Sequence, residues 1–272
     1  MISRADIERL LAEDVPAGDL TTAALGIGDR PGRMTFAARG EMVLAGVDVA
    51  LWMMDGLGVV RHARDGDQLS AGAPILEAHG QASDLHRTWK VAQTLLEILS
   101  GVASATRAVV DAAVPVPVAT TRKTVPGARA LSQLAVRAGG GILHRHGLSE
   151  TILVFPEHRL FLAGESLNEI ATRLRRTQPE KALAIEVGTI DEAAEAAVAG
   201  FDVVQLEKFT PEALAELVSC LPAKDKRARL AAAGGIDPTN AAAYVAAGAD
   251  LLVTSWPYTA RPRDVAVRFF AD

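Results

Sequence analysis

The second half of the chain alternates between short apolar runs and amphipathic stretches. The apolar runs predict strands at Val114–Thr120, Thr151–Phe155, Ala182–Val187, Val203–Leu206, Arg229–Ala233 and Leu251–Thr254. Helical spacing separates the later runs, over Glu165–Arg176, Asp191–Ala199, Pro211–Leu221 and Pro238–Ala247. From Ala182 onward the strands recur about every 20 to 27 residues, the length of one βα unit. The pattern predicts an open, incomplete β/α barrel. A dinucleotide-binding fold is disfavoured because no Gly-x-Gly-x-x-Gly follows a strand.

The first 105 residues follow a different pattern. A helix is predicted over Ser3–Ala12, where a Ser and an Asp have the spacing of an N-terminal capping pair. Alternating stretches between residues 32 and 47, bounded by glycines and prolines, predict short strands. A long helix is predicted at Asp84–Ser100. We therefore expect an α/β chain with two domains, an α+β domain at 1–105 and the barrel at 106–261.

Composition agrees with this architecture and narrows the class of protein. Hydrophobic residues make up 49% of the chain and aromatic residues only 4%, which is typical of helices packed on a parallel sheet. A net charge of -5 argues against nucleic-acid binding. The single Cys220 excludes an internal disulfide framework. Because no apolar run approaches the roughly 18 residues of a membrane span, we expect a soluble, cytoplasmic protein with no membrane partner.

One window of the chain lacks carboxylates. Between Asp111 and Glu150 lie 38 residues without Asp or Glu, although acidic residues outnumber Lys and Arg, 33 to 28, in the whole chain. The basic side chains of this window are Arg122, Lys123, Arg129, Arg137, His144, Arg145 and His146. Cations without counter-ions in an acidic protein attract anions from outside the chain. The window therefore predicts binding of a multiply anionic small molecule.

Charged residues and glycines gather where the predicted strands end. Chemistry in a β/α barrel takes place at the carboxyl ends of the strands. The residues at these ends are Thr121, Arg122, Lys123, Glu186, Glu207, Lys208, Gly234, Gly235 and Ser255. We expect them to share one face, which would combine two carboxylates, several cations and a glycine-rich turn.

Three of these features have a structural as well as a functional interpretation. Glu186 and Glu207 are either exposed, salt-bridged carboxylates or a pair that places Mg²⁺ and stabilises positive charge. The turn at 234–238, with its Asp as helix N-cap and its Pro at the first helical position, has either a steric role or binds phosphate. The His-Arg-His triplet at 144–146 is either a solvated loop or an anion-recognition site, and its place after three glycines in the acid-free window favours anion recognition. A metal site is disfavoured, because no nearby carboxylate or Cys completes a ligand set.

Six motifs occur in the order found in a known enzyme family. They are Gly18-Asp19-Leu20-Thr21-Thr22, Leu99-Ser100-Gly101-Val102-Ala103-Ser104, Thr121-Arg122-Lys123-Thr124-Val125-Pro126-Gly127, Gly139-Gly140-Gly141-Ile142-Leu143-His144-Arg145, Ile185-Glu186-Val187 and Ala233-Gly234-Gly235-Ile236. In these motifs, which span nearly all of the chain, the sequence resembles quinolinate phosphoribosyltransferase, also called carboxylating nicotinate-nucleotide diphosphorylase. The resemblance implies an N-terminal α/β sandwich to which the tail 262–272 returns, and an open β/α barrel. It also implies a homodimer or higher homo-oligomer with shared active sites.

The resemblance implies a reaction and a role for individual residues. A phosphoribosyl group would pass from phosphoribosyl pyrophosphate (PRPP) to an anionic, quinolinate-like aromatic acceptor, with release of pyrophosphate. The 5′-phosphate would be held by Gly234, Gly235 and Ser255. The leaving pyrophosphate would be neutralised by Arg122, Lys123 and Mg²⁺, and the metal would be placed by Glu186 and Glu207. The acceptor would be bound by His144, Arg145, His158, Lys208 and, from the other subunit, Lys90. The catalytic residues in this assignment are Lys123, Glu186 and Glu207.

The chain departs from the family pattern in ways that concern the acceptor. Phe155 stands where the family has a substrate-facing Lys, and Lys90 stands where it has an Arg that reaches across the dimer. Lys208 follows the strand-end acid in place of an Asn. These changes are similar to the ModD branch, whose members are encoded with molybdate transport systems. Phe155 in place of Lys removes one positive charge, and Lys90 in place of Arg removes a guanidinium that can bind a carboxylate through two hydrogen bonds. Both changes favour an acceptor less anionic than quinolinate. The alternative hypothesis is a non-catalytic binder of molybdate or of a molybdenum-related metabolite.

Overall fold

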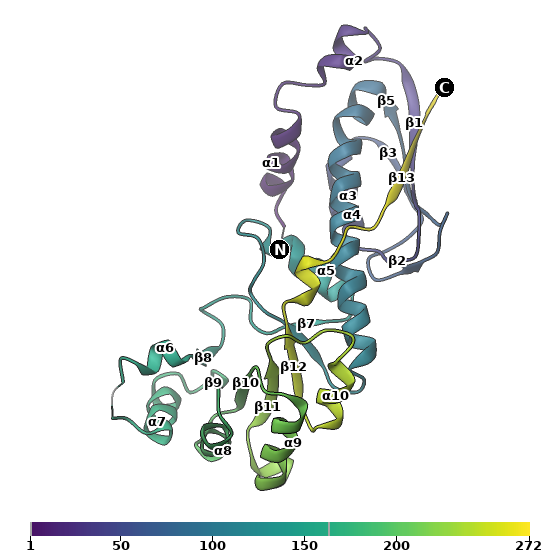
Figure 1. Ribbon diagram of the computed structural model, residues 1–272. Helices are drawn as coiled ribbons and strands as arrows, with labels where there is room; N and C mark the ends of the chain where they lie inside the picture. The colour runs from purple at the N-terminus through teal and green to yellow at the C-terminus, as the bar shows by residue number, and fades with distance from the viewer. Residues whose placement is uncertain (1, 163) are drawn as a thin grey trace. The chain divides into compact units, whose positions relative to one another are not determined.

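The computed structural model describes residues 2–162 and 164–272, and the chain folds into two compact units (Figure 1). The first unit contains the chain up to Arg107, together with Thr124–Gly140 and Pro257–Asp272. The second unit contains Ala108–Lys123 and Gly141–Trp256. The sequence predicted a first domain at 1–105, to which the tail 262–272 returns, and a barrel at 106–261. In the structure, residues 106–107, 124–140 and 257–261 also belong to the first unit.

Close backbone packing explains why residues 124–140 belong to the first unit. A Cβ atom on Gly139 would lie 2.4 Å from the carbonyl oxygen of Ala103. A Cβ on Gly140 would lie 2.7 Å from a guanidinium nitrogen of Arg107. Because glycine has no Cβ, Gly139 and Gly140 can lie this close to the long helix that contains Ala103 and Arg107. The glycines of the Gly-Gly-Gly motif therefore have a packing role in addition to any role beside the basic residues that follow.

The first unit is built on an antiparallel sheet. Its strands are β1 (Pro31–Ala38), β2 (Met42–Val43), β3 (Gly58–Arg61), β4 (Gln68–Leu69), β5 (Pro74–Gln81) and β13 (Val265–Ala271). Four of them form a sheet of order β13-β1-β5-β3, and β2 pairs with β4. The helices are α1 (Arg4–Asp14), α2 (Leu20–Ala24), α3 (Val47–Met53), α4 (Ala82–Ala112) and α5 (Arg129–Ala138). The C-terminal residues enter this sheet as β13, antiparallel to β1.

Helix α4 is longer than the helix predicted at Asp84–Ser100. It continues through Gly101, where a Cβ would lie 2.5 Å from the carbonyl oxygen of Arg261, so the glycine serves close packing and does not end the helix. Two serines one turn apart, Ser100 and Ser104, accept hydrogen bonds from the backbone N–H groups of Ala45 and Val43 at 3.1 and 2.9 Å. These bonds join the helix to the segment after β2. Tertiary contacts thus extend the helix beyond the pattern visible in the sequence.

The second unit contains one parallel sheet. Its strands are β6 (Val118–Thr120), β7 (Ile142–Leu143), β8 (Ile152–Val154), β9 (Leu183–Val187), β10 (Val203–Glu207), β11 (Arg229–Ala233) and β12 (Leu251–Thr254), in the order β7-β6-β12-β11-β10-β9-β8. The connecting helices are α6 (Pro156–Arg159), α7 (Leu167–Thr177), α8 (Ile190–Val198), α9 (Pro211–Cys220) and α10 (Ala241–Ala246), with short 3₁₀ turns η1 (Lys224–Lys226) and η2 (Trp256–Thr259). The predicted α/β architecture with an open barrel is confirmed.

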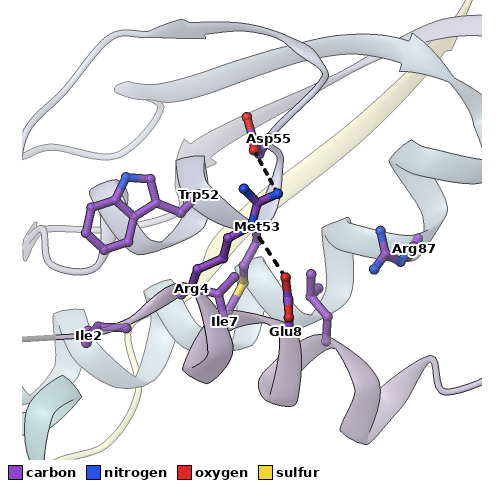
Figure 2. Close-up of a pocket in the computed structure, with 9 residues that line it drawn as sticks. Ile2, Arg4, Ile7, Glu8, Trp52, Met53, Asp55 and Arg87 are labelled. Atoms are coloured by element: carbon purple, nitrogen blue, oxygen red, sulfur yellow. Dashed lines mark ion pairs between the residues drawn. The ribbon is translucent and has the colours of Figure 1, made fainter.

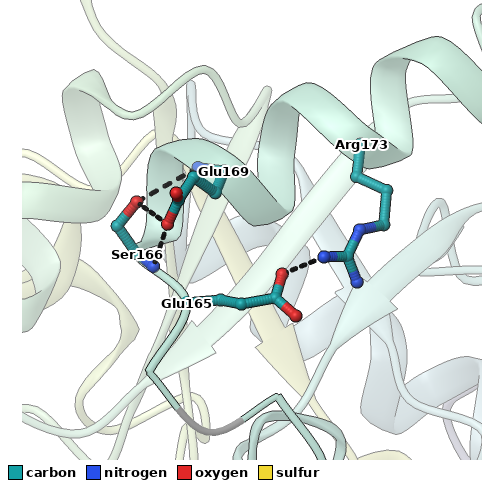
Figure 3. A network of polar contacts seen from close by, with 4 residues as sticks. All are labelled: Glu165, Ser166, Glu169 and Arg173. Carbon is teal, nitrogen blue, oxygen red and sulfur yellow. Dashed lines mark hydrogen bonds and ion pairs between the residues drawn. The ribbon is translucent and has the colours of Figure 1, made fainter.

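Several boundaries differ from the prediction for identifiable reasons. The first predicted strand, Val114–Thr120, is reduced to β6, because Pro115 and Pro117 have no N–H to donate to a ladder. Helix α5 was not predicted at all. Helix α7 matches its prediction and begins with a capping box, in which Ser166 and Glu169 bond to each other's backbone N–H (Figure 3). Glu165 and Arg173 form an ion pair beside it.

Alternate residues of the parallel strands serve two different cores. One face carries Val118, Leu230, Ala232 and Leu252 into the large core under helices α7–α10. The opposite face carries Ala119, Ala231, Ala233 and Val253, which form a smaller cluster. Strands covered on both faces have near-continuous apolar sequences, which explains the unbroken runs of the sequence pattern. Small alanines on the inner face leave space at the ends of the strands.

The sheet is open, and a side-chain contact bridges its two edge strands. In the part of the chain that the structure describes, β7 and β8 are at opposite ends of the strand order and share no ladder. Nevertheless the guanidinium of Arg145, just after β7, lies 5.7 Å from the ring centroid of Phe155, just after β8. Such a separation is within the range of a cation–π contact. The sheet therefore curls until its edges meet at this Arg145–Phe155 contact, which we call the edge seam.

Two Gly-x-Asp triplets, Gly200-Phe201-Asp202 and Gly248-Ala249-Asp250, each lie between a helix and the strand that follows it. Gly200 and Gly248 both have φ of 100°, which only glycine adopts readily. The Asp that ends each triplet accepts a hydrogen bond from the first part of the neighbouring strand, Asp202 from Leu183 N at 2.7 Å and Asp250 from Leu230 N at 2.8 Å. The repeated triplet thus ties each strand to its neighbour.

None of the described helices has the length and apolar character needed to cross a membrane.

Candidate functional site

A pocket of about 670 Å³ lies at the carboxyl ends of the parallel strands of the second unit. The predicted site residues that line it are Arg122, Lys123, His144, Arg145, Glu186, Glu207, Lys208, Gly234, Gly235 and Ser255. Further lining residues include Thr121, Phe155, Glu157, Gln205, Asp237 and Trp256. Since parallel strands present their carboxyl ends at one edge, residues far apart in sequence converge here. The expectation that the strand-end residues share one face agrees with this geometry.

Apart from Lys208 after β10, the cations of the pocket come from the ends of β6 and β7. Arg145 is only 7% exposed, and burial followed by the nearby charge of Arg122 lowers its pKa. No carboxylate among residues 2–162 and 164–272 forms an ion pair with either arginine, and the Nε of Arg122 is buried without a hydrogen-bond partner. Burial and the charge of Arg145 also lower the pKa of His144, so its imidazole is neutral at neutral pH. Two crowded guanidinium groups without counter-ions create a strong preference for an anionic ligand.

The acid-free window contributes only part of its charge to this pocket. Arg129 and Arg137 lie on α5, in the first unit, and do not line the pocket. His146 is turned to the carboxylate of Glu150, which accepts from its backbone N–H and lies 3.7 Å from its ring nitrogen. The window therefore overestimated the size of the anion-binding cluster, because proximity in sequence does not decide which element a residue packs on.

The carboxylates of the pocket come from the neighbouring strands β9 and β10. Glu186 is paired in register with Gln205, and Gln205 Nε2 donates a hydrogen bond of 2.5 Å to Glu186 Oε2. Burial raises the pKa of Glu186 and the charge of Glu207 raises it further, while the bond from Gln205 lowers it. Glu157 also raises this pKa and Lys123 lowers it. The two glutamates are thus close enough to repel each other, which is the arrangement that a cation relieves.

These carboxylates are compatible with Mg²⁺. Among the described residues, no three His, Cys, Asp or Glu side chains gather as ligands of one metal ion. Mg²⁺ in phosphate-handling sites usually takes one or two carboxylates and completes its shell with water and substrate phosphate oxygens. A mutually repelling pair, Glu186 and Glu207, beside cations suited to phosphate has the donors of such a site.

The glycine-rich turn after β11 lies against the end of β10. Gly234 and Gly235 have φ of 90° and 75°, and a Cβ on Gly234 would lie 2.9 Å from Cγ of Lys208 and 3.3 Å from a carboxylate oxygen of Glu207. After β12, Thr254 Oγ1 donates to the carbonyl of Ile236 at 2.6 Å, which ties the segment carrying Ser255 to this turn. The turn and the strand-end charges therefore occupy one corner of the pocket.

The expected helix start at Asp237 is wrong. Helix α10 begins at Ala241, and its N-cap position is Asn240. Asp237 accepts bonds from Thr239 N and Thr239 Oγ1 at 2.7 and 2.6 Å, and Asn240 Nδ2 donates to the carbonyl of Gly235 at 2.8 Å. Local Asx-type hydrogen bonds therefore compete successfully with helix formation over these residues. A phosphate here would meet the glycine turn and not the first turn of the helix.

Lys208 has an unusual backbone conformation. It has φ of 58°, and among the described residues it is the one non-glycine with positive φ. Its backbone N–H donates to the carbonyl of Ala233 at 2.8 Å, so the neighbouring strand holds it in place. Left-handed backbone is unfavourable for most L-residues but tolerated by Asn. Strain of this kind is often retained where a side chain has a functional position.

Replacing Lys208 should separate stability from ligand binding. We expect Lys208→Asn to raise the free energy of unfolding by up to about 1 kcal/mol, because Asn relieves most of the left-handed penalty. The same change should weaken binding of anionic ligands, since it removes a cation from the pocket. Urea denaturation and calorimetric titration with pyrophosphate measure the two effects. If Lys208→Asn is less stable than the parent, the left-handed backbone conformation of Lys208 does not lower the free energy of unfolding.

Two predicted site residues are not in this pocket. His158 lies on α6, where its Nδ1 accepts a 3.0 Å hydrogen bond from the backbone N–H of Phe155 and its ring stacks on the phenyl ring at 5.9 Å. His158 therefore orients Phe155 and does not line the cavity. Lys90 lies on α4 in the first unit, where its ammonium is 3.2 Å from Gln93 Oε1 and 5.0 Å from the ring of Trp89. Its expected role depends on a second subunit and stays a prediction.

Three lining residues with ionisable or hydrogen-bonding side chains were not predicted from the sequence. Gln205 lies two residues before Glu207 on the same strand, and the period-2 rule of strands placed it on the same face. Glu157 lies in α6, three residues after the last residue of β8, and so near a strand end of the kind already considered. Trp256 follows Ser255 and its backbone N–H donates to Thr254 Oγ1 at 3.0 Å. All three lie on or within three residues of a strand end, which was a signal present in the sequence.

A second pocket, of about 500 Å³, lies in the first unit (Figure 2). Arg4 points to both Glu8 and Asp55, at 3.4 and 3.6 Å, so the main charges of this pocket satisfy one another. Its remaining lining is mostly apolar, with Ile7 and Trp52. Its other cation, Arg87, is exposed, and the pocket has neither the crowded pair of guanidinium groups nor the glycine-rich turn of the strand-end pocket, which is therefore the candidate active site.

Comparison with known proteins identifies the family of the chain. The model of the quinolinate phosphoribosyl transferase N-terminal domain matches residues 19–100, and that of the C-terminal domain matches residues 102–268. The chain belongs to the quinolinate phosphoribosyl transferase family. The resemblance drawn from the six motifs is confirmed, and with it the expectation of a phosphoribosyltransferase-type enzyme.

Individual relatives cover nearly the whole chain. The "Putative pyrophosphorylase ModD" of Rhodobacter capsulatus is 45% identical over 248 residues, which is 89% of this chain and 95% of the relative. The structure of NadC from Streptococcus pyogenes is similar with a TM-score of 0.90 at 28% identity, covering 98% of this chain and 96% of the other. The nicotinate-nucleotide pyrophosphorylase of Francisella tularensis gives a TM-score of 0.89 at 26% identity, with coverage of 99% and 98%.

Proposed function

We propose that this protein transfers a phosphoribosyl group from PRPP to an anionic, quinolinate-like aromatic nitrogen heterocycle and releases pyrophosphate. The observation that carries the proposal is the convergence of unpaired cations, paired carboxylates and a glycine turn in one pocket. PRPP contains a 5′-phosphate and a pyrophosphate, so its binding requires two anion sites with a cation-binding site between them. Family membership supports the same reaction class.

The donor would be bound from the middle of the sheet. Gly234, Gly235 and Ser255 offer backbone and hydroxyl donors at the ends of β11 and β12, which suit a phosphate. Arg122 and Lys123 follow the adjacent strand β6 and would neutralise the pyrophosphate as it leaves. Because β6, β12 and β11 are neighbours in the sheet, the two phosphate positions fall within the length of one PRPP molecule.

The bond exchange needs positioning and electrostatics, with no covalent nucleophile from the protein. The acceptor nitrogen bonds to C1 of the ribose while the bond from C1 to the pyrophosphate oxygen breaks, and positive charge develops on the sugar. Glu186 and Glu207 would face that charge, and their carboxylates would hold Mg²⁺. When bound, Mg²⁺ supplies charge neutralisation for the pyrophosphate oxygens. Neutral His144 and cationic Arg145 would bind the acceptor's anionic group.

A direct assay tests the proposed function. Purified protein is incubated with Mg²⁺ and PRPP, with and without candidate pyridine carboxylates, and pyrophosphate release is followed. Acceptor-dependent release is expected. Glu207→Gln serves as the matched inactive protein, because a contaminating enzyme would be unaffected by it. If PRPP neither binds by calorimetry nor yields pyrophosphate with any acceptor, the proposal is wrong.

Molybdate binding gains no support from the pocket. A simple oxyanion binder needs only cations and hydrogen-bond donors, and would have no use for the paired carboxylates Glu186 and Glu207 in the same cavity. The comparisons likewise contain nothing that favours it over phosphoribosyl transfer.

Arg122→Ala should weaken binding of the anionic substrates. Arg122 lines the pocket without an ion-pair partner among the described residues, so truncation removes a charge-assisted hydrogen bond to the substrate worth roughly 1.5–3 kcal/mol. The dissociation constant of PRPP, measured by calorimetry, should rise about 10- to 150-fold. Arg176→Ala, on the exposed side of α7, is the control and should change nothing. Unchanged affinity in Arg122→Ala would remove that residue from the site.

The active form should be at least a dimer if Lys90 serves a neighbouring site. Light scattering combined with activity measurements across a dilution series should show activity falling as the oligomer dissociates. Lys90→Ala should then raise KM for the acceptor without changing the affinity for PRPP. A fully active monomer at micromolar concentration would contradict both the dimer and the role of Lys90.

A further inference from the structure

The pocket is divided into two walls of opposite character. The cationic wall consists of residues after β6 and β7, with Arg122, Lys123 and Arg145 as its charges. The opposite wall consists of residues on and after β8, β9 and β10, and apart from Lys208 at its far end its charged and amide groups offer hydrogen-bond acceptors: Glu157, Glu186, Gln205 and Glu207. The two walls meet at the edge seam, because the sheet curls until Arg145 contacts Phe155.

Gln205 gives the acceptor wall an unmet requirement. Its side chain lies in the pocket lining, and the residue is only 6% exposed. One N–H of Nε2 donates the 2.5 Å bond to Glu186, which sets the orientation of the amide. Oε1 is buried and has no hydrogen-bond partner among the described residues. A buried acceptor without a donor is unfavourable, and a ligand with an N–H group that reaches it through a small rotation of the amide would remove that cost.

A ligand bound at the edge seam would contact both walls. A carboxylate can bind Arg145 and Arg122, where no protein carboxylate competes. A second carboxylate on the same ring would be directed to the β8 side, where it would meet the phenyl ring of Phe155 and the charge of Glu157. Lys208 does not help there, because its side chain lies against Gly234 on the β11 side of β10, whereas Gln205 bonds to Glu186 on the β9 side. The acceptor wall thus disfavours a dicarboxylate and favours a hydrogen-bond donor.

We propose that the acceptor is an aromatic nitrogen heterocycle with a single carboxylate and, next to it, an amino or other N–H donor group that bonds to Gln205 and Glu157. This inference rests on the proposed function and specifies its substrate class. In this arrangement Arg145 and Arg122 bind the carboxylate, the ring packs beside Phe155, and the N–H group satisfies Gln205 Oε1. Glu186 and Glu207 remain free for the donor and its metal.

Three pyridine-3-carboxylates that differ only at carbon 2 test the proposal. They are nicotinate with hydrogen, quinolinate with a carboxylate, and 2-aminonicotinate with an amino group. Calorimetric titration of the full-length protein should give 2-aminonicotinate a dissociation constant about tenfold or more below that of nicotinate, the effect of one charge-assisted hydrogen bond. Quinolinate should bind more weakly than nicotinate. Tighter binding of quinolinate, equal affinity for all three, or no measurable binding of any overturns the proposal.

Two variants assign the preference to the acceptor wall. Gln205→Met and Glu157→Gln should each reduce the advantage of 2-aminonicotinate over nicotinate severalfold, while nicotinate itself serves as the internal reference for an intact cationic wall. Phe155→Lys should reverse the order and favour quinolinate, because it adds a cation beside Arg145. Glu195→Gln, on the exposed side of α8, should leave the order unchanged. If 2-aminonicotinate keeps its advantage over nicotinate in both Gln205→Met and Glu157→Gln, these two residues do not recognise the substituent.

The proposed function and this inference fail in different ways. Titration with PRPP and Mg²⁺ in the absence of any acceptor tests the donor site alone. If PRPP binds and pyrophosphate is released with quinolinate as the best acceptor, phosphoribosyl transfer stands and the substrate class is wrong. If the amino compound binds best but PRPP does not bind, the acceptor wall stands and phosphoribosyl transfer is wrong.

Discussion

Glu207→Gln and Glu186→Gln should each lower kcat/KM roughly 100- to 1,000-fold, the loss seen when one preorganised electrostatic group is removed from an active site. Both carboxylates lie in the strand-end pocket, and the pKa of Glu186 is raised by burial and by Glu207. Removing one of them relieves repulsion in the free protein, so neither variant should lose stability. A large loss of activity without a loss of folding is the signature of a catalytic and not a structural role.

The pH dependence of activity should report the same coupling. A carboxyl with a raised pKa stays protonated to higher pH, and protonated Glu186 cannot stabilise positive charge. Activity should therefore fall, as pH is lowered, at a pH above the ordinary glutamate value of 4.5. Gln205→Met removes the hydrogen bond that opposes this shift, and should move the acid limb of kcat/KM to still higher pH.

Controls decide whether the glutamates act directly. Glu195→Gln changes an exposed carboxylate on α8 and should leave kcat/KM unchanged. Thermal unfolding compares the folding of all variants. If Glu186→Gln and Glu207→Gln retain activity within twofold of the parent, the proposed metal and sugar-facing roles are wrong. An equal loss in Glu195→Gln would instead indicate a nonspecific effect of net charge.

Asp250→Ala should destabilise the second unit by about 3–5 kcal/mol, the cost of leaving one member of a buried ion pair alone. The carboxylate of Asp250 is 3% exposed and bonds to Arg227 at 2.8 Å, Lys224 at 2.6 Å and Leu230 N at 2.8 Å. The Arg227 side chain is itself only 5% exposed. Its charge would remain buried in the variant without a partner.

The second Gly-x-Asp triplet provides a matched control. Asp202 makes the same backbone bond, to Leu183 N, and pairs with Arg175 at 3.1 Å, but the two side chains are 38% and 42% exposed. Water can solvate Arg175 when its partner is removed, so Asp202→Ala should cost clearly less. Urea denaturation of the two variants measures the difference. Equal losses would mean that the backbone bond, and not the buried charge, dominates.

The contribution of Asp250 should depend on pH in a defined direction. Burial alone would raise the pKa of Asp250, but the bonds from Lys224, Leu230 and Arg227 outweigh it and hold the pKa below the usual 3.8. The ionised form is therefore favoured by folding. Its stabilisation is complete above the unfolded pKa and is lost as pH falls through the lower, folded value. The difference between parent and Asp250→Ala should shrink only in that acidic range.

The sequence alone determined the alternation of strands and helices in the barrel. From Ala182 to Thr254 the strands and helices follow from local periodicity and from caps such as Ser166, because each residue's spacing to its near neighbours fixes which face it shows. The sequence also determined that Arg122, Glu186 and Glu207 would share one edge, since parallel strands end together. The place of the site could therefore be predicted from the strands and the residues at their ends, without any knowledge of long-range contacts.

Tertiary structure decided how these pieces meet. The curl of the sheet is a sum of small strand twists, and only that sum brings Arg145 to Phe155 from opposite edges. Packing of Gly139 on α4 moves residues 124–140 out of the second unit, and the αL conformation of Lys208 is imposed by the neighbouring strand. The pairing of Gln205 with Glu186 depends on a register between separate βα units. Such features are absent from sequence patterns because they are set by contacts between residues far apart in the chain, whose energies no local spacing encodes.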